Sequence, residues 1–272
     1  MKTIETSIIN YLNPPVIEVV CGILFKPIIG LLAPHLGLLW EKFKPQYPYS
    51  REVPPLAPII EPFEGNHQVK FELTDVPPLP RIWFIHFNEN GIIQVQRDRF
   101  LHNWRKVRPN DEYPRYHKVI EMFQNRFSVF ESFLQEHNLD KIVPLQYEIT
   151  YINHISQGQG WETISEIGKI FPDFTFKSHH GRFLPQPEDI NWRTSFVLPN
   201  RAGRLHVIIR QAIEKESNLP ILLLELTVRG IGSDRTPEGM WDWFNIARKW
   251  IVNGFADLTD EEVQKRIWKR EN

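Results

Sequence analysis

The sequence has very little cysteine, since Cys21 is the single one among 272 residues. One thiol can neither form a disulfide within the chain nor complete a multi-cysteine zinc site, so nothing requires an oxidising compartment. The net charge is also small, at −1 at pH 7. This balance argues against a nucleic-acid binder that works through overall basicity, although a local basic face remains open.

Long apolar runs are missing as well. The N-terminus, MKTIETSIINYLNPP, has no sustained apolar core of the kind found in signal peptides, and no window approaches the roughly 18 apolar residues of a membrane span. We therefore expect a cytoplasmic protein that has no membrane partner.

Catalytic signatures are absent too: there is no Walker loop, HExxH, CxxC or GxSxG motif. Gly230-Ile231-Gly232 follows an expected strand, but position 235 is Arg where a dinucleotide-binding loop has Gly. The pair His179-His180 is more typical of a polar loop than of a metal site. We expect no cofactor, no bound metal and no catalytic residue. The sequence favours a protein without enzymatic activity, although it does not decide the question.

What the chain does have is proline and tryptophan, with 22 and nine residues, in an otherwise ordinary composition of 42% hydrophobic and 24% charged residues. The prolines cluster in Val53–Pro80, which predicts an extended, loop-like passage without a regular helix. Within this passage, His67–Leu73 (HQVKFEL) has the composition of a strand.

The stretch Arg81–Arg105 reads as a β-hairpin, because two runs rich in Ile, Val, Phe and Trp flank an Asn/Gly turn. Its second strand is expected to be unusually long. Apolar alternation stops after Gln96 while strand-forming composition continues, so this strand should leave the core and project arginines and aromatic rings. The candidate partner-binding residues are Arg97, Arg99, His102, Trp104 and Arg105. The alternative is arginine stems packed over an aromatic edge, with their charged ends in water.

Helical spacing is clear in two long segments. Pro114–Asn138 carries one apolar stripe of Val119, Phe123, Phe127 and Phe130. The segment that begins at Pro237 carries a second stripe, which we interpret as core: Trp243, Ala247, Trp250, Ile251 and Phe255. A strand at Val16–Phe25 and a shorter helix after Pro34 precede the proline-rich passage.

These elements recur in the same order. A strand after Pro144, helical spacing in WETISEIGKIFP, a hairpin from Arg193 and the strand ILLLELTV repeat the first half. We expect two pseudo-repeated β-α-β(n)-α units, residues 14–140 and 141–272, after an N-terminal arm of residues 1–13. A single α+β domain whose elements merely alternate remains the alternative.

Such units predict an α+β fold with an antiparallel sheet and helices on one face, loosely like the TATA-binding-protein and helix-grip folds. Strand parity then places Glu18, Glu148, Glu225 and Arg229 on the other, polar face. The simplest explanation of these charges is a solvated face, because antiparallel sheets commonly face water on one side.

Several runs carry a family resemblance over nearly the whole chain: NPPVIEVVCGILF, HLGLLWEKFKPQYP, QVQRDRFLHNWRK with the following YPRY, and GFADLT in the terminal helix. They resemble a family of sporadically distributed prokaryotic proteins that carries no assigned activity. The resemblance implies a patchy distribution, which is typical of horizontally moved genes, including bacterial defence and toxin–antitoxin loci.

Three classes of function stay open. The first is a non-catalytic interaction protein, whose partner would be an effector or toxin of such a locus. The second is a nucleic-acid-binding module that uses the Arg/aromatic strand and needs a continuous positive patch. The third is an enzyme or small-ligand binder, which would need a deep pocket containing the three glutamates.

Overall fold

The computed structural model describes residues 9–61, 79–174, 183–215 and 217–271. The expected strand His67–Leu73 and the pair His179-His180 lie outside these described residues.

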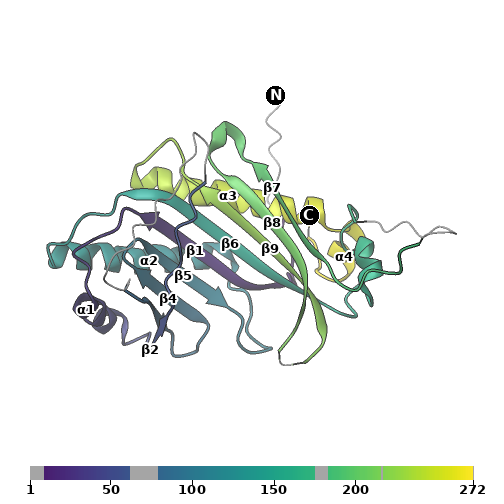
Figure 1. Ribbon diagram of the computed structural model, residues 1–272, viewed down its shortest axis with the longest axis horizontal. Coiled ribbons are helices and arrows are strands. Elements are labelled where there is room, and N and C mark those ends of the chain that lie inside the picture. The colour runs from purple at the N-terminus through teal and green to yellow at the C-terminus, as the bar shows by residue number, and fades with distance from the viewer. Residues whose placement is uncertain (1–8, 62–78, 175–182, 216, 272) are drawn as a thin grey trace.

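Nine strands in the described residues form one sheet with the order β2-β3-β4-β5-β1-β6-β9-β8-β7. Every neighbouring pair is antiparallel. Figure 1 shows the sheet as one layer, so the expected α+β class with an antiparallel sheet is confirmed. The strands are β1 (Val16–Phe25), β2 (Tyr49–Val53), β3 (Arg81–Ile85), β4 (Gly91–Gln96), β5 (Arg99–Arg105), β6 (Pro144–Ser156), β7 (Asn191–Val197), β8 (Arg204–Ile213) and β9 (Pro220–Gly230).

Two long helices lie behind this layer in Figure 1. The sequence explains how α3 begins: the Thr236 side chain accepts a hydrogen bond from the Gly239 amide, Pro237 fits the first turn, and Glu238 complements the helix dipole. The helical elements are α1 (Ala33–Phe43), α2 (Arg115–Glu136), α3 (Pro237–Leu258), α4 (Glu261–Arg266) and the 3₁₀ turns η1 (Ile164–Lys169) and η2 (Pro199–Arg201).

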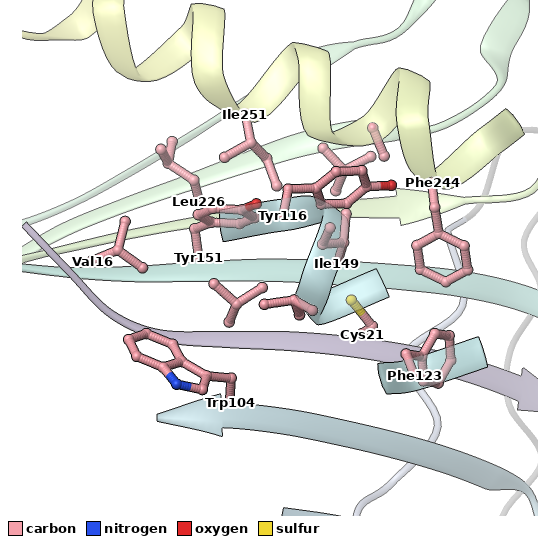
Figure 2. Close-up of a cluster of buried hydrophobic side chains, with 14 of the residues drawn as sticks. Val16, Cys21, Trp104, Tyr116, Phe123, Ile149, Tyr151, Leu226, Phe244 and Ile251 are labelled. Carbon is pink, nitrogen blue, oxygen red and sulfur yellow. The ribbon is translucent and has the colours of Figure 1, made fainter. Parts of the chain in front are cut away.

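The main core lies between the sheet and these helices. On β1 the alternate residues Val19, Cys21 and Ile23 are fully buried towards the helices, as strand parity requires. In α2 the ring of Phe123 lies 5.4 Å from that of Phe244 in α3, so the two helices meet over the centre of the sheet. Figure 2 shows this cluster, with Cys21 among the buried side chains. Burial raises the pKa of the Cys21 thiol, which is therefore a small apolar core group.

The stripe on α3 is buried at four of its five expected positions. Trp243, Ala247, Ile251 and Phe255 are between 0% and 6% exposed. Trp250 is only partly buried and packs against the edge of the core. It lies at the boundary of the apolar stripe, where one side of a helical residue faces solvent.

The prediction of one long strand after Gly91 is wrong, because the chain turns at Arg97 and Asp98 and forms two strands instead. The strands β4 and β5 on either side of this turn pair with each other, with Gln96 opposite Arg99. The end of apolar alternation at Gln96 marks the turn rather than an exit from the core. After the turn, alternation resumes with Phe100 and Trp104 on the helix side.

The helix expected in WETISEIGKIFP is also shorter than its spacing suggested. Only Ile164–Lys169 is helical, and this segment is a 3₁₀ turn. Gly168 and the β-branched residues of the segment have low helix propensity, and Pro172 prevents extension at the other end. The buried side chains of Ile164 and Ile167 still cover the core.

Candidate functional site

A chain of polar side chains crosses four strands on the sheet face opposite the helices. Asn103 on β5 donates to the Glu18 carboxylate on β1 over 2.5 Å and accepts a bond from Gln94 over 2.6 Å. Gln94 on β4 in turn accepts bonds from Arg81 and Trp83 on β3, at 2.7 and 3.0 Å. Because each member holds the next, the network fixes the side chains of this half of the face.

The other half of the face carries the remaining predicted glutamates. Glu148 on β6 forms an ion pair with Arg229 on β9. Glu225 accepts a bond from Thr227 at 3.2 Å. Ile152 on β6 is the register partner of both Glu18 and Glu225, so these two carboxylates flank one residue in a cross-strand row.

Burial raises the pKa of the Glu18 carboxyl. The hydrogen bond from Asn103 and the charge of Arg105 oppose this rise, and the charge of Glu225 adds to it. A carboxyl that retains its proton to higher pH could serve as a general acid, but acid/base chemistry also needs a cavity for a substrate. Two pockets of about 420 and 320 Å³ in the described part of the chain are lined by other residues than Glu18, Glu148 and Glu225.

A proline-rich segment, residues 54–61, crosses this polar face, and we call it the strap. It leaves β2 at the edge of the sheet without forming a helix or strand, as the prolines predict. Its contacts with Gln96 on β4, with Gln146 on β6 and with Arg204 on β8 trace a path over the sheet from β4 to β8. Figure 1 shows the strap in front of the central strands.

Two glutamines hold the strap backbone. The Leu56 amide donates to Gln96 Oε1 at 2.9 Å, and Gln96 Nε2 returns a bond to the Leu56 carbonyl at 3.1 Å. Gln146 repeats this with the Glu61 amide at 2.9 Å and the Ile59 carbonyl at 2.7 Å. A side-chain amide can satisfy a backbone donor and acceptor together, so each glutamine replaces a strand neighbour for the extended strap.

The strap ends in a carboxylate socket. Arg204 on β8 donates to Glu61 Oε2 at 2.6 Å, and His206 forms a short bond with the other carboxylate oxygen. The Glu61 side chain is only 5% exposed. Burial raises its pKa, but the bond and charge of His206 and the charge of Arg204 outweigh burial, so the pKa of Glu61 is lowered. The socket therefore favours an ionised carboxylate.

Acid is expected to loosen the strap. Because the folded pKa of Glu61 lies below its ordinary value of 4.5, the stability it contributes is present above pH 4.5 and is lost as the pH falls through the folded pKa. Hydrogen exchange at the Leu56 and Glu61 amides, referenced to the β6 amide of Ile149, measures this between about pH 6 and about pH 3. In Glu61→Gln these amides should exchange fast at both ends of the range. Equal protection in wild type and variant at every pH would contradict the expectation.

The structure places the five predicted partner-binding residues mostly inside the fold. Arg99, His102 and Trp104 are at most 5% exposed, so the expectation that this strand projects them is wrong. Arg97 donates to the Leu31 carbonyl and Arg105 to the Glu89 carbonyl, at 3.1 and 2.8 Å. The turn after Gln96 returns the chain to the sheet and directs alternate side chains into the core.

Each of the three buried residues has a structural partner. Arg99 forms a bidentate pair with Asp98, with both distances 3.1 Å. The hydroxyl of Tyr47 lies 3.2 Å from His102 Nε2. The ring of Trp104 packs 5.4 Å from that of Tyr113. These contacts give each of the three side chains a partner within the fold, while the other ring nitrogen of His102, Nδ1, is buried without a hydrogen-bond partner.

Sequence reasoning missed Gln96, Gln146 and Glu61, the residues that hold the strap. Their contacts join positions 40 to 145 residues apart. The available signal was the polar parity of both glutamines on their strands, next to a proline-rich segment that could not be a helix. Parity shows which face such a side chain occupies, but not which segment crosses it.

Comparison with protein-family models, curated proteins and solved structures finds no match for this chain. Among the residues that the structure describes, no helix combines the length and apolar composition needed to cross a membrane. In the same part of the chain, no three His, Cys, Asp or Glu side chains form a group that could hold a metal ion.

Proposed function

We propose that the protein is a non-catalytic binding protein that presents its strap to a protein partner. The observation that carries this proposal is the exposure of the apolar strap residues. Leu56, Ile59 and Ile60 are 38%, 58% and 36% exposed, although the backbone on which they sit is hydrogen-bonded to the sheet. Adjacent exposed apolar side chains on a held segment are typical of a recognition surface.

The glutamine and arginine contacts make the strap a pre-ordered ligand. A free peptide of this composition loses backbone freedom when it binds, and that loss weakens affinity. In the folded protein the two glutamines and the Glu61 socket have already fixed the backbone at both ends of the strap. Proline at positions 54, 55 and 58 restricts it further.

The chemistry of the strap indicates the kind of partner. Extended proline-containing segments dock into apolar, aromatic-lined grooves, where proline rings and aliphatic side chains fill shallow pockets. We therefore propose a partner with such a groove. An effector or toxin encoded beside the protein in a mobile bacterial locus is the first one to examine.

A nucleic-acid partner fits the polar face less well, because several of its arginines are paired with acidic groups. Arg99 pairs with Asp98, Arg204 with Glu61 and Arg229 with Glu148. Neutralised guanidinium groups contribute little to the attraction of phosphates.

The test is capture from a native-like lysate by the immobilised protein, with both protein and nucleic acid identified. The double variant Ile59→Ser/Ile60→Ser should retain at least tenfold less of the partner, while Ile246→Ser, at an exposed apolar position on α3, should retain it normally. A peptide of residues 53–61 should compete, and its scrambled version should not. A partner retained equally by the strap variant would contradict the proposal.

A variant that releases the strap from the sheet distinguishes two modes of binding. The partner either binds the strap where it is held, or displaces the strap and binds the sheet. If the partner reads the held strap, Gln96→Ala/Gln146→Ala should weaken binding several-fold, because the ordering cost returns. If the partner instead displaces the strap and occupies the sheet, the same variant should bind more tightly. Tighter binding would overturn the presentation model.

We also propose that the fold arose by internal duplication, with a likeness to TATA-binding-protein-like and helix-grip folds. The strand order supports this, because β3-β4-β5-β1 on one side mirrors β7-β8-β9-β6 on the other about the β1/β6 pair. In each set a hairpin is followed by a strand and a long helix. A superposition of residues 14–137 on 144–258 that separates the two hairpins would remove the proposal.

A further inference from the structure

A pocket of about 420 Å³ opens on the helix side of the sheet, away from the strap. Its size lies within the ~300–1,000 Å³ range of small-molecule sites. The start of α2, the second half of α3 and strands β1, β6 and β9 form its walls, and residues 9–11, 14 and 15 form its rim. This rim is fixed to the end of the chain, since the Leu12 and Asn13 amides donate to the carbonyls of Lys269 and Trp268.

One wall of the pocket is apolar. Val16, Leu226 and Ile251 are buried and come from β1, β9 and α3. Figure 2 shows them around the rings of Tyr116 and Tyr151. Flat aromatic and branched aliphatic surfaces together suit the apolar body of a small organic molecule.

The pocket also offers a hydroxyl proton. The hydroxyls of Tyr113 and Tyr151 lie 2.9 Å apart, so one donates to the other. Two hydroxyls carry two protons, and this bond uses only one of them. Burial raises the pKa of Tyr113 to about 12, so the pair remains protonated at neutral pH. The second proton can therefore be donated to an acceptor in the pocket.

Arg248 gives the pocket a positive charge without a paired anion. Its guanidinium lies 5.0 Å from the centre of the Tyr116 ring. Its Nε atom is buried without a hydrogen-bond partner, and within the described ranges Arg248 has no ion pair. A buried donor on a cation is costly when it has no acceptor.

The other charged groups at the pocket do not supply this anion. Arg115 is a second cation and donates to the Tyr11 carbonyl at 2.6 Å. His117 and Glu271 line the pocket at exposed positions. The inner part of the site therefore combines a guanidinium, a spare hydroxyl proton and an apolar wall.

We propose that this pocket binds a small organic monoanion, an aromatic or branched carboxylic acid. Its carboxylate pairs with Arg248 and accepts the spare proton of the Tyr113–Tyr151 pair as a hydrogen bond. Its apolar body packs against Val16, Val252 and Phe255, the apolar lining residues that keep some accessible surface. A guanidinium recognises a carboxylate through two parallel hydrogen bonds, which the buried Nε of Arg248 can help to form. This site is independent of the strap and of its partner.

The test is isothermal titration calorimetry of the full chain with 2-naphthoate and its neutral analogue 2-naphthamide. Naphthoate should bind at least tenfold more tightly than the amide. Arg248→Gln should lower the naphthoate affinity at least tenfold, while Arg210→Gln, at an exposed position on β8, should leave it unchanged.

A second variant keeps the test decisive if Arg248→Gln does not fold. Val252→Trp places a large side chain at a partly buried position of the wall and should abolish naphthoate binding while circular dichroism and melting stay those of the folded protein. Equal affinity for naphthoate and its amide, unchanged affinity in Arg248→Gln or Val252→Trp, or no binding of naphthoate at millimolar concentration would each overturn the proposal.

Discussion

Replacing Trp243 by Ala is expected to lower the free energy of unfolding by about 3–5 kcal/mol. The side chain is 2% exposed, and its ring lies 5.5 Å from that of Tyr147 on β6. Its indole nitrogen also donates to the Ala202 carbonyl at 2.7 Å. The substitution therefore leaves a cavity between α3 and the sheet, and it removes a hydrogen bond that fixes the turn before β8.

The matched control lies two turns further along the same helix. Trp250→Ala makes the same chemical change at a partly buried position, so its cost should be clearly smaller. Urea unfolding of the two variants and the wild type measures both values. Equal losses would mean that burial at the sheet does not determine the contribution of this helix.

Acidification is expected to destabilise the fold through His102, with a loss of roughly 1.4 kcal/mol for each pH unit below about 6.5. Burial, together with the charges of Arg126 and His86, lowers the pKa of His102 to about 3. Between these two pH values the unfolded chain binds a proton that the folded chain does not. Stability therefore falls as the pH falls, and this contribution levels off only below about pH 3.

The variant His102→Gln isolates this effect. Gln cannot titrate, yet it can still bond to the Tyr47 hydroxyl, which lies 3.2 Å from His102 Nε2. Free energies of unfolding from urea titrations at pH 7, 6, 5 and 4 should fall less steeply in this variant. His117→Gln, at an exposed site, provides the comparison. Parallel pH slopes in wild type and His102→Gln would show that the pKa of His102 is not lowered in the folded protein.

Sequence periodicity was sufficient for the elements that pack on one face. In α2 the apolar residues recur every three or four positions, and the observed helix, Arg115–Glu136, lies within the predicted Pro114–Asn138. Strand β1 likewise alternates between partly buried and buried side chains from Glu18 to Cys21, after a register shift between Val16 and Glu18. In both cases the burial pattern is local and repeats with the geometry of the element.

Local reasoning failed where a turn carried no glycine or proline. Arg97 and Asp98 reverse the chain between β4 and β5, although their neighbours have strand composition throughout. Asp98 is stabilised there by its bidentate contact with Arg99, a side-chain arrangement that composition does not reveal. Charged residues were consequently interpreted as an exposed surface when they formed a turn.

The strap could not be placed from sequence for a different reason. Its position depends on single contacts between distant residues, such as Glu61 with Arg204 and His206, and these leave no periodic trace. The same applies to the pocket, whose cation and hydroxyls come from α3, from the loop before α2 and from β6. Periodicity predicts which faces are buried, but not which separate residues meet on them.

The path of the strap has a consequence for how this architecture can change over generations. Val53 and Arg81 are register partners at the ends of neighbouring strands, so the intervening chain is an insertion within one hairpin. Lengthening such a connection costs little, only about 0.6 kcal/mol per doubling of its length. Lineages could therefore exchange this insertion for another of different length and chemistry while β2 and β3 keep their pairing. The sheet would then act as a conserved platform, and each replacement could bring a new specificity.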